Sequence, residues 1–334
     1  MIPDAASQPV HDTSRAIDLF RQMVRIRRFE TAAVECLARG EIFGSIHSSI
    51  GQEAVAVGVC ANLGPEDVIT STHRGHHHVL AKGADPNRMM AELFGRRTGT
   101  NIGRGGSMHI ADFAAGVLGA NGIVGGGLSI AVGAAHGLRV AGTPGVVVCF
   151  FGDGATNRGP FLEALNWASL FRLPVLFVCE DNDFAAYTSG PSMIAGAGPS
   201  ARARALGVAA CEADGSDVLA IDMAASVALM ACRNGEGPRF LLVTTSRLAG
   251  HTIGDDESYR PRADVADKWR GDPIEVMSRR LLASGVAQDE LLGIETAAAE
   301  EIGRAVRFAR GSPWPDGSDL LMNVQQTGAP SWHA

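Results

Sequence analysis

Two polar sites in the middle of the chain carry residue types that suit a magnesium ion. An apolar run ends at the letters GDG (152–154), and a second apolar run, 175–179, ends at EDN. The spacing predicts strand, turn, helix and strand, which is one right-handed crossover of a parallel sheet. Such a crossover places Asp153 and Asn182 at the carboxyl ends of parallel strands, where α/β sheets bind ligands. A carboxylate and an amide oxygen are ligands of Mg²⁺, which keeps few protein ligands and relies on phosphate oxygens.

The two glycines that flank Asp153 add a second feature, because they would let a diphosphate approach the backbone at the following helix. Two other interpretations stay open at this stage. A dinucleotide-binding fold also places Gly-x-Gly after a strand, although its third glycine is absent here and the acid would repel a pyrophosphate without a cation. Alternatively, the only role of Asp153 is to cap the helix that follows it.

The remaining pattern predicts an α/β protein with a doubly wound, mainly parallel sheet and helices on both faces. Helices are expected at 13–39, 51–62, 86–96, 127–141 and 217–233, with two more before about residue 310, and strands at 67–70, 146–151, 207–211 and 239–245. Residues 185–205 are rich in Gly, Pro and Ser and predict a mobile loop, and 246–272 is polar and loop-like. We expect a flexible N-terminus (1–12), one α/β domain with helical extensions (13–310) and a C-terminal tail (311–334).

Composition narrows the classes of partner and compartment. The chain has 334 residues, 46% of them hydrophobic, with a net charge of −7 and no long basic run, which argues against nucleic acid as a partner. Its first residues lack the pattern of a signal peptide, and no apolar stretch approaches the length that spans a membrane. The six cysteines are scattered without close pairs, as expected for reduced thiols of a cytoplasmic protein.

Several blocks in a fixed order give the chain a family resemblance. GDG followed by Asn182 resembles the binding motif of thiamine diphosphate enzymes, GDG…NN. Nearly the whole chain is similar to the α subunit of heterotetrameric 2-oxo acid dehydrogenases, and looks closest to the acetoin dehydrogenase branch. The matching blocks are IRRFE (26–30), HSSIGQEA (47–54), THRGH (72–76), GRGGSMHI (103–110), NGIVGGG (121–127), GDGATNRG (152–159), EALNWASL (163–170), GH (250–251) and SYR (258–260).

The resemblance assigns roles to individual positions. It implies that Asp153, Asn182 and the backbone carbonyl of Phe184 hold Mg²⁺. It implies that thiamine diphosphate is bound by His73, Arg74, Gly122, Val124, Asp153, Gly154, Ala155, Arg158, Asn182 and His251, with Arg74 on the diphosphate, Arg158 beside the phosphates, and Gly122 and Val124 along the aminopyrimidine. His47 and His251 are the implied catalytic residues on the thiazolium side, where substrate reacts.

Histidine suits that role because its unperturbed pKa of about 6.5 allows acid and base chemistry near neutrality. The run His76 to His78 looks like a transition-metal cluster, but it lacks Cys or acidic companions at ligand spacing, so a zinc site is disfavoured. We expect His76 near the site, His77 and His78 at the surface, and a structural role for His109. Glu53 is also expected to be structural, since in this family the glutamate that protonates the aminopyrimidine comes from a separate β chain.

The resemblance further implies cleavage of the carbon–carbon bond next to a ketone, in acetoin or in a 2-oxo acid such as pyruvate, with transfer of the acyl unit to a lipoyl acyltransferase. It implies a β subunit that completes the site in an α2β2 heterotetramer. Asp181 and Asp183 depart from the family pattern and add negative charge on either side of Asn182. Two alternatives stay open: a thiamine-dependent carboligase or lyase without lipoyl transfer, and a non-catalytic homologue, against which the intact site residues argue.

Overall fold

A six-stranded parallel sheet forms the centre of the molecule. The computed structural model describes residue 10 and residues 12–322. The strands are β1 (Val68–Thr70), β2 (Val117–Gly119), β3 (Val147–Gly152), β4 (Val175–Asp181), β7 (Ala209–Asp214) and β8 (Arg239–Thr244), in the spatial order β2-β1-β3-β4-β8-β7. The order reverses between β1 and β3, which makes their carboxyl ends the expected ligand-binding crevice. The predicted parallel, doubly wound sheet is confirmed.

The central strands are buried on both faces, which explains their nearly continuous apolar sequence. In β3, Val148 and Phe150 belong to one buried cluster, while Val147, Cys149 and Phe151 belong to the other. Alternate residues of a strand point to opposite faces, so each strand contributes to two cores. Helices therefore cover both faces of the sheet, as predicted.

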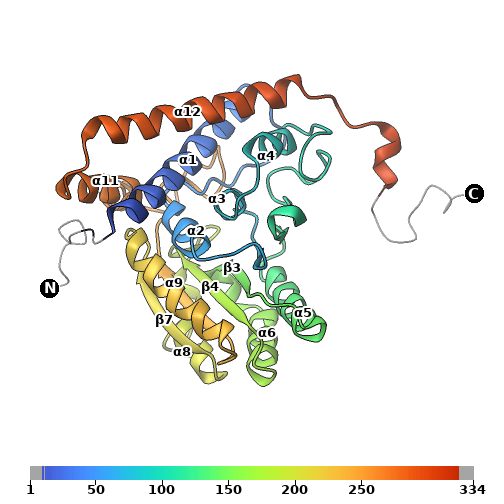
Figure 1. The fold of residues 1–334 in the computed structure, drawn as a ribbon, viewed down its shortest axis with the longest axis vertical. Coiled ribbons are helices and arrows are strands. Elements are labelled where there is room, and N and C mark those ends of the chain that lie inside the picture. Colours follow the sequence, from blue (N-terminus) through green and yellow to red (C-terminus); the bar gives the residue numbers. More distant parts are fainter. Residues whose placement is uncertain (1–9, 11, 323–334) are drawn as a thin grey trace, which may run out of the picture.

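The larger core lies under α1 (Thr13–Ala38), α2 (Glu53–Cys60), α3 (His76–Ala81), α4 (Pro86–Leu93), α9 (Val218–Arg233), α11 (Pro273–Ala283) and α12 (Gln288–Gly311). The smaller core lies under α5 (Gly126–Ala141), α6 (Gly159–Leu170) and α8 (Pro199–Ala205). Figure 1 shows α12 running along α1 at the top of the view, with the sheet below them. Among the described residues, no helix is both long and apolar enough to cross a bilayer.

Two predicted loops contain more structure than their sequences indicate. Residues 185–205 include a β5–β6 hairpin (Phe184–Ala185 and Thr188–Ser189), α7 (Gly190–Met193) and α8, and residues 246–272 include α10 (Arg262–Trp269). Their helical turns are short, so Gly, Pro and polar residues dominate the local pattern.

The chain ends fall largely outside the described residues. Residues 1–9 and 11 of the predicted N-terminal segment and 323–334 of the predicted tail are not described. Val10 packs against the core, and the side chain of Asp12 caps α1 by accepting from the Arg15 N–H. The tail contains a 3₁₀ turn, η4 (Gly317–Leu321).

One buried carboxylate shapes the glycine-rich loop that leads to the pocket. Glu92 of α4 is fully buried, and its oxygens accept four backbone N–H groups. The distances are 2.7 and 2.8 Å from Asn101 and Gly103 to Oε2, and 2.7 and 3.2 Å from Gly105 and Gly106 to Oε1. The sequence GRGG therefore owes its conformation to an acid on another element.

Replacement of Glu92 by alanine is expected to lower the free energy of unfolding by about 3 kcal/mol, because a buried N–H left without a partner costs about 1–3 kcal/mol. Urea unfolding of the full chain would measure it. Glu35→Ala is the matched control, since Glu35 pairs with Arg39 at the surface and should contribute little. Equal stability of the two variants would contradict the assigned role of Glu92.

Candidate active site

The predicted site residues converge on one cavity of about 350 Å³. It lies at the carboxyl ends of β1, β3 and β4, the crevice where the strand order reverses. Its lining includes His47, His73, Arg74, Gly122, Val124, Asp153, Gly154, Ala155, Asn182, Phe184 and His251. Arg158 differs from the prediction: it is exposed and is not among the lining residues, and its Cβ lies beside Gly125 at the start of α5.

Asp153 is a buried polar residue of the cavity lining. Its side chain is buried, and Oδ2 has no hydrogen-bond partner among the described residues. Burial, followed by the charges of Asp181 and Asp183, raises the pKa of Asp153 to about 7. Its side chain caps neither η3 (Asp153–Asn157) nor α6, so the capping interpretation is wrong. An unpaired buried carboxylate is costly unless a cation completes it, so the residue fits a metal ligand.

Residues 182–190, called the metal loop after the ion that the sequence predicts there, fold against Asp153. Gly154 is required here, because a Cβ at this position would lie 2.7 Å from the Cβ of Ala185. Asn182 Oδ1 accepts the N–H of Phe184 over 3.3 Å. The departures from the family pattern are accommodated: Asp183 has a left-handed φ of 69° and pairs with Lys268 of α10 over 3.0 Å. This ion pair offsets part of the added negative charge.

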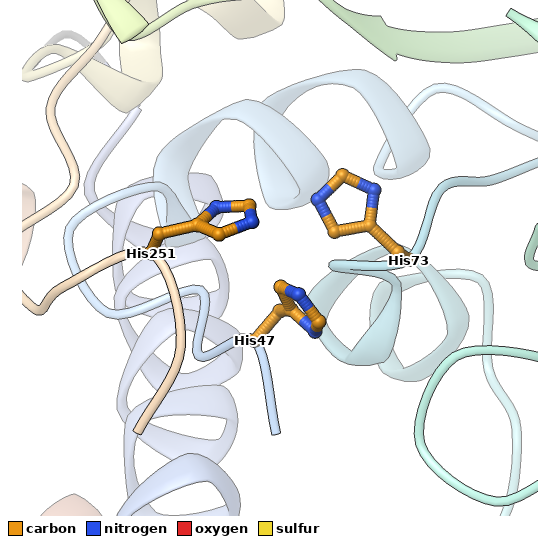
Figure 2. A group of neighbouring side chains, drawn as sticks. All are labelled: His47, His73 and His251. Carbon is orange, nitrogen blue, oxygen red and sulfur yellow. The ribbon is translucent and has the colours of Figure 1, made fainter. Parts of the chain in front are cut away.

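Three histidines of the cavity lining point toward one another (Figure 2). The ring centroid of His47 lies 4.7 Å from that of His73 and 4.9 Å from that of His251, although the three residues come from separate loops. Burial and the neighbouring charges of His73 and Arg74 lower the pKa of His47 to about 3. The pKa of His73 is lowered to about 3 by burial and Arg74, and that of His251 to about 4 by burial, Arg74 and Arg247. All three are neutral at pH 7.

The same three rings place potential metal-ligand atoms within 4.8 Å of one another. However, Arg247 Nη1 lies 3.0 Å from His251 Nδ1 and can only donate, so Nε2 must carry the ring proton. A neutral histidine in this tautomer offers Nε2 as a donor rather than as a metal ligand. The arrangement therefore fits proton chemistry better than a transition-metal site.

The sequence profile described as "Dehydrogenase E1 component" matches residues 21–317. The chain belongs to the dehydrogenase E1 component family. It is therefore an oxidoreductase component, and the family implies thiamine diphosphate as its cofactor.

Curated relatives of this E1 chain are similar over nearly their whole length. The α subunit of an acetoin:2,6-dichlorophenolindophenol oxidoreductase from Bacillus subtilis is 44% identical over 93% of this chain and 93% of its own. The subunit of the same name from Cupriavidus necator is 39% identical over 96% and 97%. The pyruvate dehydrogenase E1 component subunit alpha of Zymomonas mobilis is 38% identical over 94% and 89%.

Arg74 is the buried cation of the E1 site. It donates to the Ser48 carbonyl, and its Nη2 donates to the His251 carbonyl over 3.1 Å. Burial, followed by the charge of Arg247, lowers its pKa to about 10, so it stays protonated at neutral pH. Its two carbonyl contacts fix the guanidinium at the cavity wall, where an anionic group of a ligand could meet it.

The prediction that His77 and His78 lie at the surface is wrong. Both are fully buried, because α3 packs under α1 and α2, and His78 stacks on Phe150 at 3.9 Å between ring centroids. They contact Glu180 of β4, an acidic companion that sequence spacing did not reveal. The two rings and Glu180 place potential metal-ligand atoms within 4.8 Å of one another, but the Nε2 atoms of both rings already face the Glu180 carboxylate, at 3.0 and 3.4 Å.

Two other residues singled out from the sequence, His76 and Glu53, are buried and connect neighbouring segments of the fold. His76 is buried between Glu30, 3.2 Å from Nδ1, and the Ser107 hydroxyl, 2.9 Å from Nε2. Glu53 is buried at the start of α2 and pairs with Arg27, in keeping with a structural role. His109 is exposed, and its Nε2 would lie 3.2 Å from a Cβ at the cavity glycine Gly122.

The polar residues of the cavity lining that sequence reasoning missed include Gln52, Glu180 and Arg247. Arg247 is buried, and besides His251 it contacts the Ala186 carbonyl through Nη2 over 3.0 Å. Arg247 thus joins the metal loop to the loop that carries His251. Its only sequence signal is its position four residues before His251, within a segment that departs from the family pattern.

The neutral histidines predict how stability depends on pH. Their folded-state pKa values lie below the unfolded value, so the unfolded chain binds more protons as pH falls below about 6.5. The stabilisation is complete above that pH and is lost between about pH 6.5 and 3, while Arg74 and Arg247 remain charged beside the rings.

Replacement of the most buried of the three, His47→Gln, should flatten this part of the profile of unfolding free energy against pH. His136→Gln, at a histidine of α5 that packs against Trp167 and Phe171 outside the cavity, is the control for the loss of a histidine. An unaltered slope in His47→Gln would contradict the lowered pKa.

Proposed function

We propose that this E1 chain is the α subunit of a thiamine diphosphate- and Mg²⁺-dependent dehydrogenase. It cleaves the carbon–carbon bond next to the ketone of acetoin, or of a 2-oxo acid such as pyruvate, and passes the acyl unit to a lipoyl acyltransferase. The observation that carries the proposal is one cavity lined by Asp153, Asn182, Arg74 and three histidines, in which Asp153 Oδ2 is buried without a hydrogen-bond partner among the described residues. This donor set fits a hard divalent cation and a diphosphate.

In this proposal Asp153, Asn182 and the Phe184 carbonyl hold Mg²⁺, and Arg74 meets the diphosphate. Gly122 and Val124, which line the wall at the start of α5, accommodate the aminopyrimidine. Bound there, thiamine diphosphate supplies the electron sink that permits cleavage next to a ketone. His251 presents Nε2–H towards the substrate side, where it can donate to a developing oxyanion. Neutral His47 and His73 can accept or relay protons beside it.

Acetoin is the favoured substrate. Two of the reported relatives carry it in their names. The three imidazoles are neutral at pH 7 and supply no charge that would hold a substrate carboxylate. A site with this charge suits an uncharged hydroxyketone better than a carboxylate.

A β subunit is proposed to complete the site in an α2β2 heterotetramer, with a lipoyl acyltransferase as acceptor and the cytoplasm as compartment. Large apolar side chains stay exposed along α5 and α6, namely Ile130, Val140, Leu162, Trp167 and Leu170. Gly133 and Gly137 of α5 also have open space beside them. Such a face is typical of a surface that a partner covers.

Co-expression with a β-type subunit of the same family tests the proposal. The purified complex should reduce a dye with acetoin only when both thiamine diphosphate and Mg²⁺ are present, and more slowly with pyruvate or branched 2-oxo acids. Carbon–carbon bond formation without dye reduction would instead identify a carboligase, and the proposal would fail if neither activity depended on the cofactor.

A further inference from the structure

A row of three buried side chains leads from the core to the predicted metal site. Glu180 and Asn182 stand at the end of β4, and Gln52 comes from the turn before α2, so the row joins two distant segments. Gln52 Nε2 donates to Glu180 Oε1 over 3.1 Å, and Asn182 Nδ2 donates to Gln52 Oε1 over 3.2 Å. All three side chains are at least nine-tenths buried and all three line the cavity.

The chemistry of the row fixes the direction of each amide. An ionised carboxylate accepts hydrogen bonds and cannot donate them, so Gln52 must turn its NH₂ group towards Glu180. Its carbonyl oxygen then faces Asn182, which must turn its own NH₂ group towards Gln52. The oxygen of Asn182 is left on the opposite side of its amide, where the Phe184 N–H already points.

Glu180 is itself held in place from the far side. His77 Nε2 lies 3.0 Å from its Oε1, and His78 Nε2 lies 3.4 Å from its Oε2. His78 Nδ1 is in turn 2.8 Å from the Ser71 hydroxyl. The carboxylate is thus fixed by two helical residues of α3, and it can orient Gln52 without moving.

We propose that Glu180 and Gln52 are positioning residues that turn the Asn182 amide so that its oxygen faces the metal. The inference rests on the proposed function, because it assumes that Asn182 binds Mg²⁺. An amide rotated by half a turn would present NH₂ to the cation and remove a ligand. Residues that orient metal ligands commonly contribute about 10–100-fold to metal affinity.

Gln52→Met tests the proposal, because methionine has a similar length but lacks the NH₂ group that donates to Glu180 and the carbonyl oxygen that accepts from Asn182. With the chain co-purified with its β-type partner and thiamine diphosphate in fixed excess, calorimetry should show Mg²⁺ binding about 10–100-fold weaker than in the wild type. Thr245→Val is the matched control: it removes a buried hydroxyl that donates to the Gly51 carbonyl beside Gln52, outside the row. Its Mg²⁺ affinity should match the wild type.

Glu180→Gln carries the same prediction and is decisive if Gln52→Met does not fold. If Glu180 acts through Gln52, the double variant should bind Mg²⁺ no more weakly than Gln52→Met alone. Losses that multiply in the double variant, or unchanged Mg²⁺ affinity in either single variant, would overturn the inference. A wild-type complex without Mg²⁺-dependent cofactor binding would instead reject the proposed function, so the two failures are distinct.

Discussion

Asp153→Ala is expected to abolish Mg²⁺-dependent binding of thiamine diphosphate. The Asp153 carboxylate is the one ionisable group among the proposed Mg²⁺ ligands, and the cation links the chain to the diphosphate. Alanine removes this ligand without breaking a hydrogen bond of Oδ2, which has none among the described residues. The fold should therefore survive while affinity is lost, and calorimetry with thiamine diphosphate and Mg²⁺ would measure both cofactor affinity and stoichiometry.

Asp183→Asn provides the matched control for this experiment. Asp183 is a neighbouring carboxylate in the metal loop, its left-handed φ of 69° suits asparagine, and its partner Lys268 is outside the cavity. We expect cofactor affinity within a few-fold of the wild type. Retained affinity in Asp153→Ala, or equal losses in the two variants, would contradict the assignment of Asp153 as the metal ligand.

The position of Asp153 and Asn182 could be predicted from the sequence because it follows from topology. Two apolar runs joined by one helix form a right-handed crossover, and β3 pairs with β4 so that Gly152 lies opposite Glu180. No contact between distant segments has to be known for this conclusion. The same logic explains why the sheet, its two covered faces and most helices were predicted correctly.

The residues that orient the site could not be found in this way. Gln52 and Asn182 are 130 positions apart, and their contact depends on how α2 packs against the end of β4. Three consecutive histidines suggest a segment exposed at the surface. Two of them contact Glu180 only because α3 is buried between other helices. Buried polar clusters of this kind give no periodic signal, because each member is satisfied by a different element.

The loops show a related limit. Residues 246–272 read as polar loop, yet Arg247 is buried there and Lys268 of α10 reaches Asp183. Short elements depend on such tertiary contacts more than on their own propensity. The loop that carries His251 is thus positioned by side chains whose partners lie in the metal loop. These contacts connect the two parts of the cavity.

Replacement of His251 by alanine tests the second half of the cavity. Its backbone N–H is held by Asp255 Oδ2 over 2.7 Å, and Arg247 fixes the ring through Nδ1, so Nε2–H is presented in one direction. We expect kcat of the reconstituted complex to fall about 10²–10⁴-fold, the usual contribution of a positioned acid or base. Cofactor affinity should change little, because alanine keeps the His251 carbonyl that accepts from Arg74 and removes none of the proposed metal ligands.

Thr252→Ala, at the next residue of the same loop, is the control for loop disturbance and should keep the wild-type kcat. A similar loss in both variants would mean that the loop, and not the imidazole, was being measured. Loss of cofactor binding in His251→Ala would assign the histidine to binding rather than to the reaction. A large fall in kcat with unchanged cofactor affinity would separate the residues that hold the cofactor from the histidine that acts on the substrate.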